Sequence, residues 1–392
     1  MNQSSHALPN IPLRRQVVEL EDSQIAAVWK LGFDVPDVIG LWVGEGDLPT
    51  PAFICEAAAR SLAAGNTFYT HKRGIPTLRE SLARYARRLY RVPVPVERIT
   101  VTGSGMNGIL LVMETLIDPG DNVVAVTPVW PNALAAVRVM GGEARPVPLA
   151  SRAGRWHLDL DLLFDSCDRR TKAIYVASPG NPTGWMMSAD EMAEVVRFCR
   201  GRGIVFLSDE VYHRFVYDRE VAPSALQVME PEDPVVIANS FSKAWAMTGW
   251  RIGWLIHPTA MAGALDKLIE YNTSGSQHFL QDGCVAAIEQ GEGFVHEQVE
   301  RCGLAREVVL QRLGAMRRVE LTRPDAAFYA FFRIDGVEDS LATAKRLVHE
   351  VQVGLAPGTA FGEGGAGWFR LCFAGSLERL AVAMDRLEPV LG

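Results

Sequence analysis

Short apolar runs alternate with helical patterns from about residue 99 to residue 257, and this alternation limits the fold more than any other feature of the chain. Strands that alternate with helices form a mostly parallel sheet, because each helix carries the chain back to the start of the next strand. We therefore predict an α/β fold. The predicted strands are Ile99–Gly103, Asn122–Thr127, Lys172–Ser178, Ile204–Asp209, Val235–Ser240 and Gly253–His257, and the predicted helices between them include Met106–Ile117, Pro131–Met140 and Ser188–Arg202.

The pattern changes after Thr259, where a long helical stretch runs to about Leu313. A strand, a helix, a second strand and a last helix follow, which indicates a smaller α+β domain. Since 392 residues exceed one average domain, we expect an N-terminal arm with part of the small domain at 1–40, a large domain at 41–275 and a small domain at 276–392. The four late segments are Ala326–Ile334, Leu341–Val351, Trp368–Ala374 and Ser376–Leu391.

The segment that follows the predicted strand Val235–Ser240 carries the clearest chemical signal. Lys243 comes at the end of this apolar run, and a desolvated amine has a lowered pKa and can hold an aldehyde as a Schiff base. Ser240, Ser242 and Arg251 supply the hydroxyl and guanidinium groups that bind phosphate. Pyridoxal phosphate carries both an aldehyde and a phosphate, so the segment predicts this cofactor; a surface lysine is the alternative.

Three polar residues after two other strands suit the ring of the same cofactor. Asp209 ends an apolar run, and a buried carboxylate is costly unless it is paired. A protonated pyridine nitrogen is a suitable partner, with a helix cap as the alternative. Asn181, in a Pro/Gly-rich segment that could also be a plain turn, and Tyr212 could both donate hydrogen bonds to the phenolic oxygen of the ring.

Gly103, Ser104 and Gly105 connect a predicted strand to a predicted helix. Backbone NH groups at such a turn form an anion nest, although a simple turn is the alternative. The complete Gly-x-Gly-x-x-Gly motif is missing there, which argues against a nicotinamide dinucleotide. Trp130 follows another strand and is expected to stack on the cofactor unless it is a core tryptophan.

Arg370 lies within the apolar stretch Gly367–Phe373. A buried arginine needs a carboxylate partner. If that partner is the α-carboxylate of an amino acid, the guanidinium fixes the orientation of the substrate; a structural ion pair is the alternative.

Charge and cysteine content exclude several other classes of protein. The net charge of −7 gives no basic footprint for nucleic acid. The six cysteines are widely spaced, without a Cys-x-x-Cys pair or a Cys/His metal spacing, so we expect reduced thiols and no metal. Met1–Arg15 has no apolar core like that of a signal peptide, and no run of 18 apolar residues exists, so we expect a cytoplasmic protein without a membrane partner.

Taken in order along the chain, these motifs resemble the class I/II aminotransferases, the fold-type I enzymes that include aspartate aminotransferase. The resemblance extends from about Val38 to Leu391. It implies a seven-stranded, mostly parallel sheet and a ping-pong transfer of an α-amino group between an L-amino acid and a 2-oxo acid. It also implies that Lys243, Asp209 and Tyr212 are catalytic and that Arg370 binds the substrate carboxylate together with Asn181.

Two earlier segments carry the same resemblance. Trp42–Pro51 resembles the loop that covers the substrate, with Gly44 near the substrate carboxylate. Thr67–Thr70 resembles the segment whose tyrosine, here Tyr69, reaches the phosphate in the neighbouring subunit. The resemblance therefore implies a homodimer with shared active sites.

The chain departs from the family pattern where some relatives carry a lysine, since it has Gly105 and Met106 in that turn. This departure favours neutral or aromatic substrates over aspartate. His278 could be a specificity residue or a structural histidine. A carbon–sulfur β-lyase, or a cyclase or oxidase of specialised metabolism, could use the same residues, and a ligand-sensing regulator is a more distant alternative.

Overall fold

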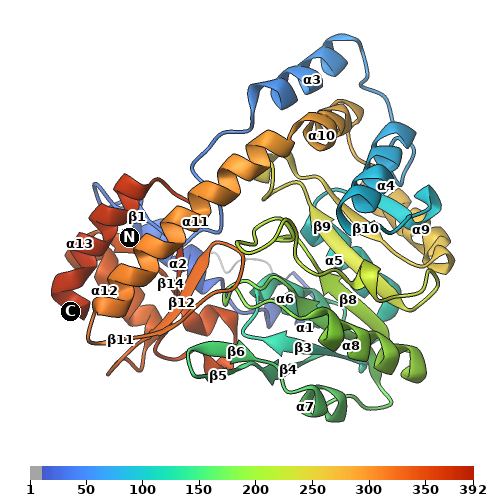
Figure 1. Cartoon of the computed structure of the whole chain (residues 1–392). Coiled ribbons are helices and arrows are strands. Elements are labelled where there is room, and N and C mark those ends of the chain that lie inside the picture. Colours follow the sequence, from blue (N-terminus) through green and yellow to red (C-terminus); the bar gives the residue numbers. More distant parts are fainter. Residues whose placement is uncertain (1–10) are drawn as a thin grey trace, which may run out of the picture.

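A seven-stranded sheet forms the centre of the larger part of the molecule in this computed structural model, which describes residues 11–392 (Figure 1). Its strands lie in the order β2-β10-β9-β8-β7-β3-β4. Neighbouring strands are parallel except at β10, which is antiparallel to both β2 and β9. The predicted α/β fold with a mostly parallel seven-stranded sheet is therefore confirmed. The bounds are β2 Ile99–Thr102, β3 Asn122–Thr127, β4 Glu143–Pro148, β7 Thr171–Ala177, β8 Val205–Asp209, β9 Val235–Ser240 and β10 Gly253–Ile256.

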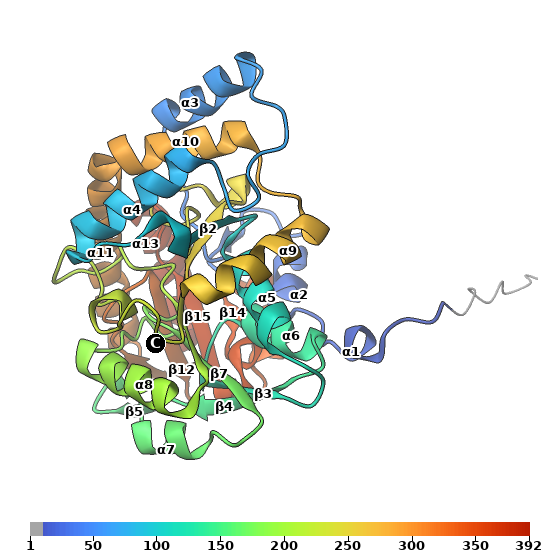
Figure 2. The same ribbon diagram turned by 90° about the vertical axis from the view of Figure 1, so that its right-hand side faces the viewer.

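Helices cover both faces of this sheet. On one face pack α5 (Gly105–Leu116), α6 (Pro131–Val139) and α9 (Ala262–Asn272), and on the other pack α4 (Pro76–Tyr90) and α8 (Ala189–Arg202) (Figure 2). Successive residues of a strand point to opposite faces. In β3, for example, Val123 belongs to the core beneath α5 and α6, whereas Val124 belongs to the core beneath α8. Because both faces are buried, the central strands are continuously apolar, which is why their positions could be predicted.

Strand β4 is the strand of this sheet that the sequence analysis did not find. It lies at the edge, contains Pro146 and Pro148, and buries only Val147. Prolines are tolerated on edge strands, where backbone NH groups need no partner. Without an apolar run, the segment lacks the usual signal of a strand in a parallel sheet. The nearby hairpin of β5 (Ala150–Arg152) and β6 (Arg155–His157) is equally short.

A second sheet of four strands, in the order β11-β12-β15-β14, forms the smaller part with α11, α12 and α13. The N-terminal segment joins this part, because β1 (Ile39–Gly40) pairs with β13 (Val353–Gly354), and α2 (Gln24–Leu31) packs on α12 and β14. Residues 1–10 of the expected arm lie outside the described residues. The remaining bounds are β11 Val319–Thr322, β12 Tyr329–Ile334, β14 Ala356–Pro357, β15 Trp368–Cys372, α1 Arg15–Val18, α12 Ser340–Val351 and α13 Leu377–Leu391.

The long helical stretch predicted after Thr259 consists of three helices, α9, α10 (His278–Gln290) and α11 (Glu292–Ala315). Gly275 separates the first two with φ of 106°, a conformation that favours glycine. Helix α10 packs on α3 (Ala52–Ala63) and α4, whereas α11 runs from α10 to the small sheet (Figure 1). The expected domain boundary at residue 275 thus separates α10 from the helices on which it packs.

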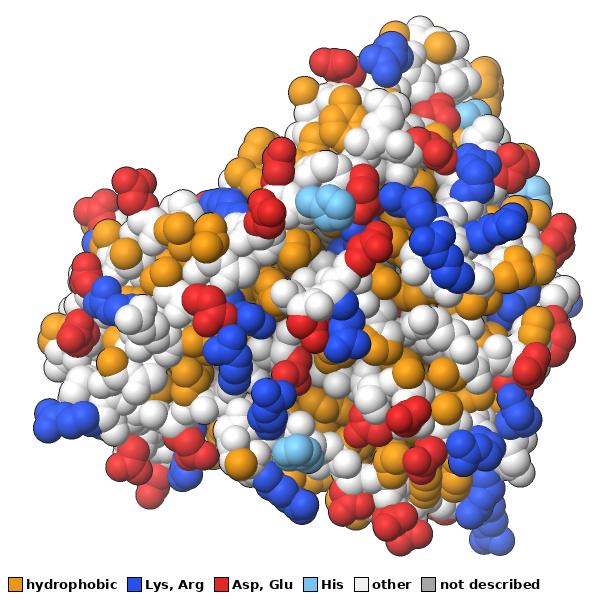
Figure 3. Space-filling model, in the orientation of Figure 1, with side chains coloured by type: hydrophobic (Ala, Val, Ile, Leu, Met, Phe, Trp, Pro, Cys, Tyr) orange, Lys and Arg blue, Asp and Glu red, His pale blue; other side chains and the backbone are white. Residues whose placement is uncertain are grey.

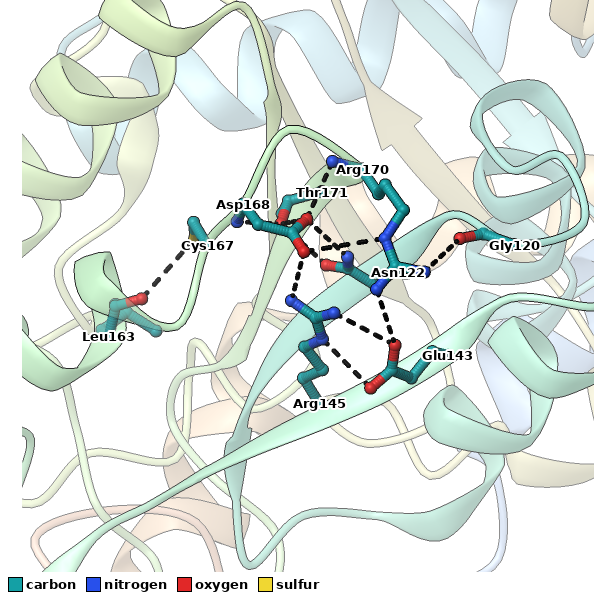
Figure 4. Close-up of polar contacts among 9 residues, drawn as sticks. All are labelled: Gly120, Asn122, Glu143, Arg145, Leu163, Cys167, Asp168, Arg170 and Thr171. Atoms are coloured by element: carbon teal, nitrogen blue, oxygen red, sulfur yellow. Dashed lines mark hydrogen bonds and ion pairs between the residues drawn. The ribbon is translucent and has the colours of Figure 1, made fainter.

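A network of polar side chains ties together the N-terminal ends of β3, β4 and β7 (Figure 4). Its centre is Asp168, which accepts hydrogen bonds from the Asn122 amide at 2.9 Å and from the Arg170 backbone NH at 2.8 Å. Arg145 of β4 lies 2.9 Å from the other carboxylate oxygen, and its guanidinium also binds Glu143. These contacts hold the pKa of Asp168 well below its usual range, the Asn122 hydrogen bond contributing most.

Basic and acidic side chains are interspersed over the face of the molecule drawn in Figure 3. This distribution agrees with a net charge of only −7 for a chain that carries 39 basic and 46 acidic residues. Between residues 11 and 392, no helix combines the length and the apolar character that crossing a membrane requires.

Candidate active site

A cavity of about 340 Å³ opens where the parallel strands end. Strands β7, β8 and β9 finish at Ala177, Asp209 and Ser240, and all three residues line it. In open α/β sheets, ligands bind in the crevice outside the carboxyl ends of the strands. The structure brings most of the predicted site residues to this cavity: Gly44, Gly105, Trp130, Asn181, Asp209, Tyr212, Ser240, Ser242, Lys243, Arg251 and Arg370.

The amine of Lys243 lies deep in the cavity and donates a hydrogen bond to the carbonyl of Gly44 at 2.6 Å. The pKa of Lys243 is lowered to about 8, chiefly by desolvation; Arg370 and Arg251 contribute in the same direction, while Cys372 and Glu45 oppose the shift. A lysine with this pKa is partly uncharged near neutral pH, which makes its amine nucleophilic. Gly44 has no room for a side chain, because a Cβ there would overlap the Tyr329 hydroxyl.

Asp209 is buried at the end of β8, where burial raises the pKa of its carboxyl. The Tyr175 hydroxyl donates to Oδ2 at 2.8 Å, and the backbone NH of Val211 donates to Oδ1 at 3.3 Å. No lysine, arginine or histidine of residues 11–392 forms an ion pair with it; Lys243 acts on its pKa only at longer range. A buried carboxylate without a paired cation fits a cationic group of a ligand.

Arg370 is fully buried in β15, beneath the same cavity. One terminal nitrogen donates to the amide oxygen of Asn181 at 3.0 Å, and the other donates to the carbonyl of Trp42. Its Nε has no hydrogen-bond partner, and no carboxylate in the described part of the chain pairs with the guanidinium. The ring of Tyr329, 4.7 Å away, adds only a weaker cation–π contact. A buried cation in this condition fits an anionic ligand.

Tyr329 belongs to the site although the sequence analysis missed it. Its hydroxyl lies 2.6 Å from the hydroxyl of Tyr212, and burial raises the pKa of both phenols. Tyr175, on Asp209, was missed in the same way. Both tyrosines lie in apolar strands, where the sequence gives no reason to distinguish an aromatic residue of the site from one of the hydrophobic core. Only the position of the neighbouring strands distinguishes them from core residues.

The residues predicted to bind phosphate lie where α5 begins beside β9 and β10. Ser240 and Ser242 are joined by a hydrogen bond of 2.8 Å between their hydroxyls. A Cβ at Gly253 would come within 2.5 Å of the Gly105 nitrogen, so only glycine allows β10 to touch the first turn of α5. Arg251 is exposed, with its guanidinium 2.6 Å from the carbonyl of Thr248.

Two predicted residues adjoin the cavity without lining it. Gly103 and Ser104 directly precede Gly105, and Ser104 caps α5 by accepting the Asn107 backbone NH at 2.9 Å.

The segment around α2 also lines the cavity, through Ser23 and Ile25, which the sequence analysis did not predict. Thr359 binds Gln24 at 2.6 Å and so fixes α2 to the small part of the molecule.

Tyr69 does not reach the cavity of its own chain. It is 92% exposed and lies in a separate surface hollow formed by residues 66–70 and 273–279. His278 borders this hollow and lies 3.6 Å from Asp282.

The chain matches the family model for aminotransferase class I and II over residues 36–387. The aspartate aminotransferase of Thermotoga maritima is 34% identical over 387 residues, which cover 99% of each chain. The solved structure of a single mutant of Thermus thermophilus aspartate aminotransferase superposes with a TM-score of 0.90 at 32% identity, covering 97% of this chain and 99% of that one. The alanine aminotransferase of Pyrococcus furiosus superposes equally well, with a TM-score of 0.90 at 25% identity over 97% of this chain and 99% of that one.

Proposed function

This chain belongs to the aminotransferase class I and II family, and on that premise we propose that its cavity holds pyridoxal 5′-phosphate. The resemblance stated from the sequence motifs is thereby confirmed, and the chain is an aminotransferase. The two molecules that exchange the amino group are an L-amino acid and a 2-oxo acid.

The observation that carries the proposal is the pair of unmatched buried charges. Arg370 has no carboxylate partner and Asp209 has no cationic partner within residues 11–392, yet both border one cavity with a lysine of lowered pKa. Such charges are costly unless a ligand pairs them. An amino acid bound together with pyridoxal phosphate would match all three residues. The substrate carboxylate would pair with Arg370, the protonated ring nitrogen with Asp209 and the cofactor carbonyl with Lys243.

When bound, pyridoxal phosphate supplies a carbonyl that accepts the amino group and a ring that withdraws electrons from the substrate Cα. We assign the phosphate to Ser240, Ser242, Arg251 and the backbone at Gly103–Gly105, and the ring face to Trp130. Asp209 would hold the protonated ring nitrogen, while Asn181 and Tyr212 would donate to the phenolic oxygen.

The chain supplies the proton transfer and the orientation of the substrate. The Arg370 guanidinium would bind the α-carboxylate of the substrate and so fix the orientation of its Cα. Lys243 would hold the carbonyl of the cofactor before the substrate arrives, and its amine would then remove the proton from the substrate Cα as a general base. With a pKa near 8, this amine is protonated and deprotonated at small cost around neutral pH.

An absorbance spectrum of the purified protein tests the proposal. We expect a visible band that converts to a near-ultraviolet band with an amino acid and returns with a 2-oxo acid. Lys243→Ala should lose this cycle, whereas Lys267→Ala, at a lysine outside the cavity, should keep it. Release of pyruvate and ammonia from a β-substituted amino acid without an oxo-acid acceptor would point to a lyase instead.

We also propose a cytoplasmic homodimer that shares its active sites, with Tyr69 reaching the partner's phosphate site. Exposed aromatic side chains around the Tyr69 hollow support this proposal, since Phe68 and Tyr271 are 83% and 89% exposed. The six free cysteines agree with a reducing compartment.

A further inference from the structure

His213 is a buried histidine that none of the roles proposed above uses. It directly follows Tyr212, which lines the cavity, but its own ring does not line it, and only 1% of the residue is exposed. The ring packs instead against Tyr85 of α4 and Trp254 of β10, with ring centroids 5.8 and 6.3 Å away. Two consecutive side chains thus reach different surroundings, one the cavity and the other the core behind it.

The segment from Glu210 to His213 is a tight turn that the His213 side chain closes a second time. The backbone NH of His213 donates to the Glu210 carbonyl at 2.9 Å, and ring Nδ1 lies 3.1 Å from the same oxygen. Tyr212 is the third residue of this turn, so its direction depends on the backbone of the turn. The Glu210 carboxylate is also held, since it accepts hydrogen bonds from the Ser208 hydroxyl at 2.9 Å and the Ala225 backbone NH at 3.0 Å.

These contacts determine which ring nitrogen of His213 carries the proton. A carbonyl oxygen only accepts hydrogen bonds, so Nδ1 donates to Glu210. Nε2 is then the acceptor, and the Tyr85 hydroxyl donates to it at 2.8 Å. Burial lowers the pKa of His213 to about 3, with Arg214 acting in the same direction and Glu292 against it. The ring is therefore uncharged near neutral pH, with its proton on Nδ1.

We propose that His213 is a positioning residue for Tyr212: its ring, held in the Nδ1–H form by Tyr85, fixes the turn so that the Tyr212 hydroxyl is directed to the phenolic oxygen of the cofactor. This inference rests on the proposed function, which assigns that hydrogen bond to Tyr212. A hydrogen bond weakens steeply once its angle departs from linearity. A small displacement of the turn is therefore enough to weaken the contact of Tyr212 with the cofactor.

The pH titration of the visible band on the holoenzyme measures this positioning. A hydrogen bond to the phenolic oxygen stabilises the form in which that oxygen is charged, so its loss moves the midpoint of the titration to higher pH. We expect Tyr212→Phe to raise the midpoint by about one pH unit or more, and His213→Phe by about half a unit or more. In the double variant, His213→Phe should add nothing to Tyr212→Phe, because the positioned hydroxyl is already absent.

His257 is a matched control for the loss of a buried histidine. It is as deeply buried as His213, its Nδ1 lies 2.9 Å from the carbonyl of Pro258, and its Nε2 lies 2.8 Å from the hydroxyl of Thr100. It follows β10 at the end of the strand away from the cavity. His257→Phe should lower the melting temperature by an amount similar to His213→Phe and leave the midpoint unchanged.

Two further variants show which contact of the ring matters. His213→Asn places an amide NH close to the position of Nδ1 and should return the midpoint close to the parent value. Tyr85→Phe keeps the histidine but removes the partner of its Nε2, so it should raise the midpoint by less than His213→Phe does. Tyr85→Phe also keeps the inference testable if His213→Phe does not fold.

NMR spectra of the cofactor-free protein test the inference without the cofactor. The chain has eight histidines and eight tyrosines, so substitution of one residue at a time assigns the signals of His213 and Tyr212. The ¹⁵N signals of His213 should be those of a neutral ring with its proton on Nδ1. The ¹³Cζ signal of Tyr212 should move in His213→Phe and in Tyr85→Phe but not in His257→Phe.

The outcomes separate failure of the inference from failure of the proposed function. An unchanged midpoint in His213→Phe, an equal rise in His257→Phe, or a full further rise in the double variant would overturn the inference and leave the proposed function intact. A proton on Nε2 of His213 would overturn it as well. A parent protein without a visible band after addition of pyridoxal phosphate would contradict the proposed function, and the NMR spectra would then decide whether His213 fixes the turn.

Discussion

At the scale of single residues, the site keeps groups in states that folding alone would not favour. Lys243 lies desolvated with a pKa near 8, Asp209 is buried with its pKa raised, and Arg370 is buried without a counter-ion. Each of these states costs free energy of folding in the protein without ligand. We infer that this cost is retained because bound ligands offset it, which is a common source of trade-off between stability and activity.

This trade-off predicts that Asp209→Asn makes the cofactor-free protein more stable and lowers its amino transfer. Burial raises the folded-state pKa of Asp209 above its unfolded value, so the ionised carboxylate destabilises the fold above that folded pKa. An asparagine can still accept the hydrogen bond from the Tyr175 hydroxyl. We expect the cofactor-free variant to melt roughly 1–4 °C higher than the parent at pH 8, while amino transfer falls about 10²-fold or more.

The pH dependence of this prediction follows from the sign of the shift. As the pH falls toward the unfolded value near 4, the carboxylate of the parent becomes protonated and the advantage of asparagine shrinks. Thermal melts of both cofactor-free proteins at pH 8 and pH 5 measure the change. A variant that is less stable than the parent at pH 8 would show that Asp209 stabilises the fold through its hydrogen bonds.

At the scale of elements, the network around Asp168 joins the start of β3, β4 and β7 at the end of the sheet opposite the cavity (Figure 4). Its hydrogen bonds and ion pairs depress the pKa of Asp168 in the folded state. A depressed carboxyl pKa stabilises the fold at every pH above the unfolded value near 4, and this contribution is lost as the pH falls toward the folded value.

We therefore expect Asp168→Asn to lower the melting temperature by a few degrees at pH 7, by nearly as much at pH 4, and by clearly less at about pH 2. Values of kcat and KM should stay unchanged, because the network is remote from the cavity. Asp165→Asn, at an exposed carboxylate of α7 (Leu160–Asp165), is the matched control and should change the melting temperature little. An equal loss of stability at pH 7 and at about pH 2 would assign the effect to packing rather than to charge.

The elements also show how far the sequence could predict this molecule. Apolar runs revealed the strand that ends at Asp209 and the strand that precedes Lys243, because strands buried on both faces leave a continuous signal. The edge strand Glu143–Pro148 has no such run and was missed. The contacts of Gly44 with Lys243 and of Tyr329 with Tyr212 join residues more than 100 positions apart, and no local pattern encodes such pairs.

At the scale of the whole molecule, the cavity is built by both parts of the chain. The large sheet brings Lys243 and Asp209, the small sheet brings Arg370 and Tyr329, and α2 brings Ile25. A change in how the two parts pack would therefore move Arg370, which we propose binds the substrate carboxylate, relative to Lys243. Because amino transfer needs reacting atoms held within a few tenths of an ångström, this packing affects turnover as directly as the lining residues do.

The proposed dimer extends this dependence to a second copy of the chain. Tyr69 is exposed and distant from its own cavity, so if it serves catalysis it must do so in another subunit. A residue supplied across a two-fold axis makes each site a product of two chains. The Lys243→Ala and Tyr69→Ala homodimers should then each have impaired amino transfer, since each substitution removes one catalytic component from both sites of the dimer.

Mixing these two variants under conditions of subunit exchange gives the decisive result. In a mixed dimer, one site combines both defects, whereas the other combines an intact Lys243 with an intact Tyr69. Random exchange should restore activity to about a quarter of the parent level, because half of the dimers are mixed and each has one complete site. A mixture of Lys243→Ala with Asp209→Ala should restore no activity, because one chain supplies both residues to its own site and no mixed dimer then has a complete site. Recovery in that control would mean that Lys243 and Asp209 of one chain do not serve the same site. No recovery in the first mixture would mean that Tyr69 acts within its own chain or not at all.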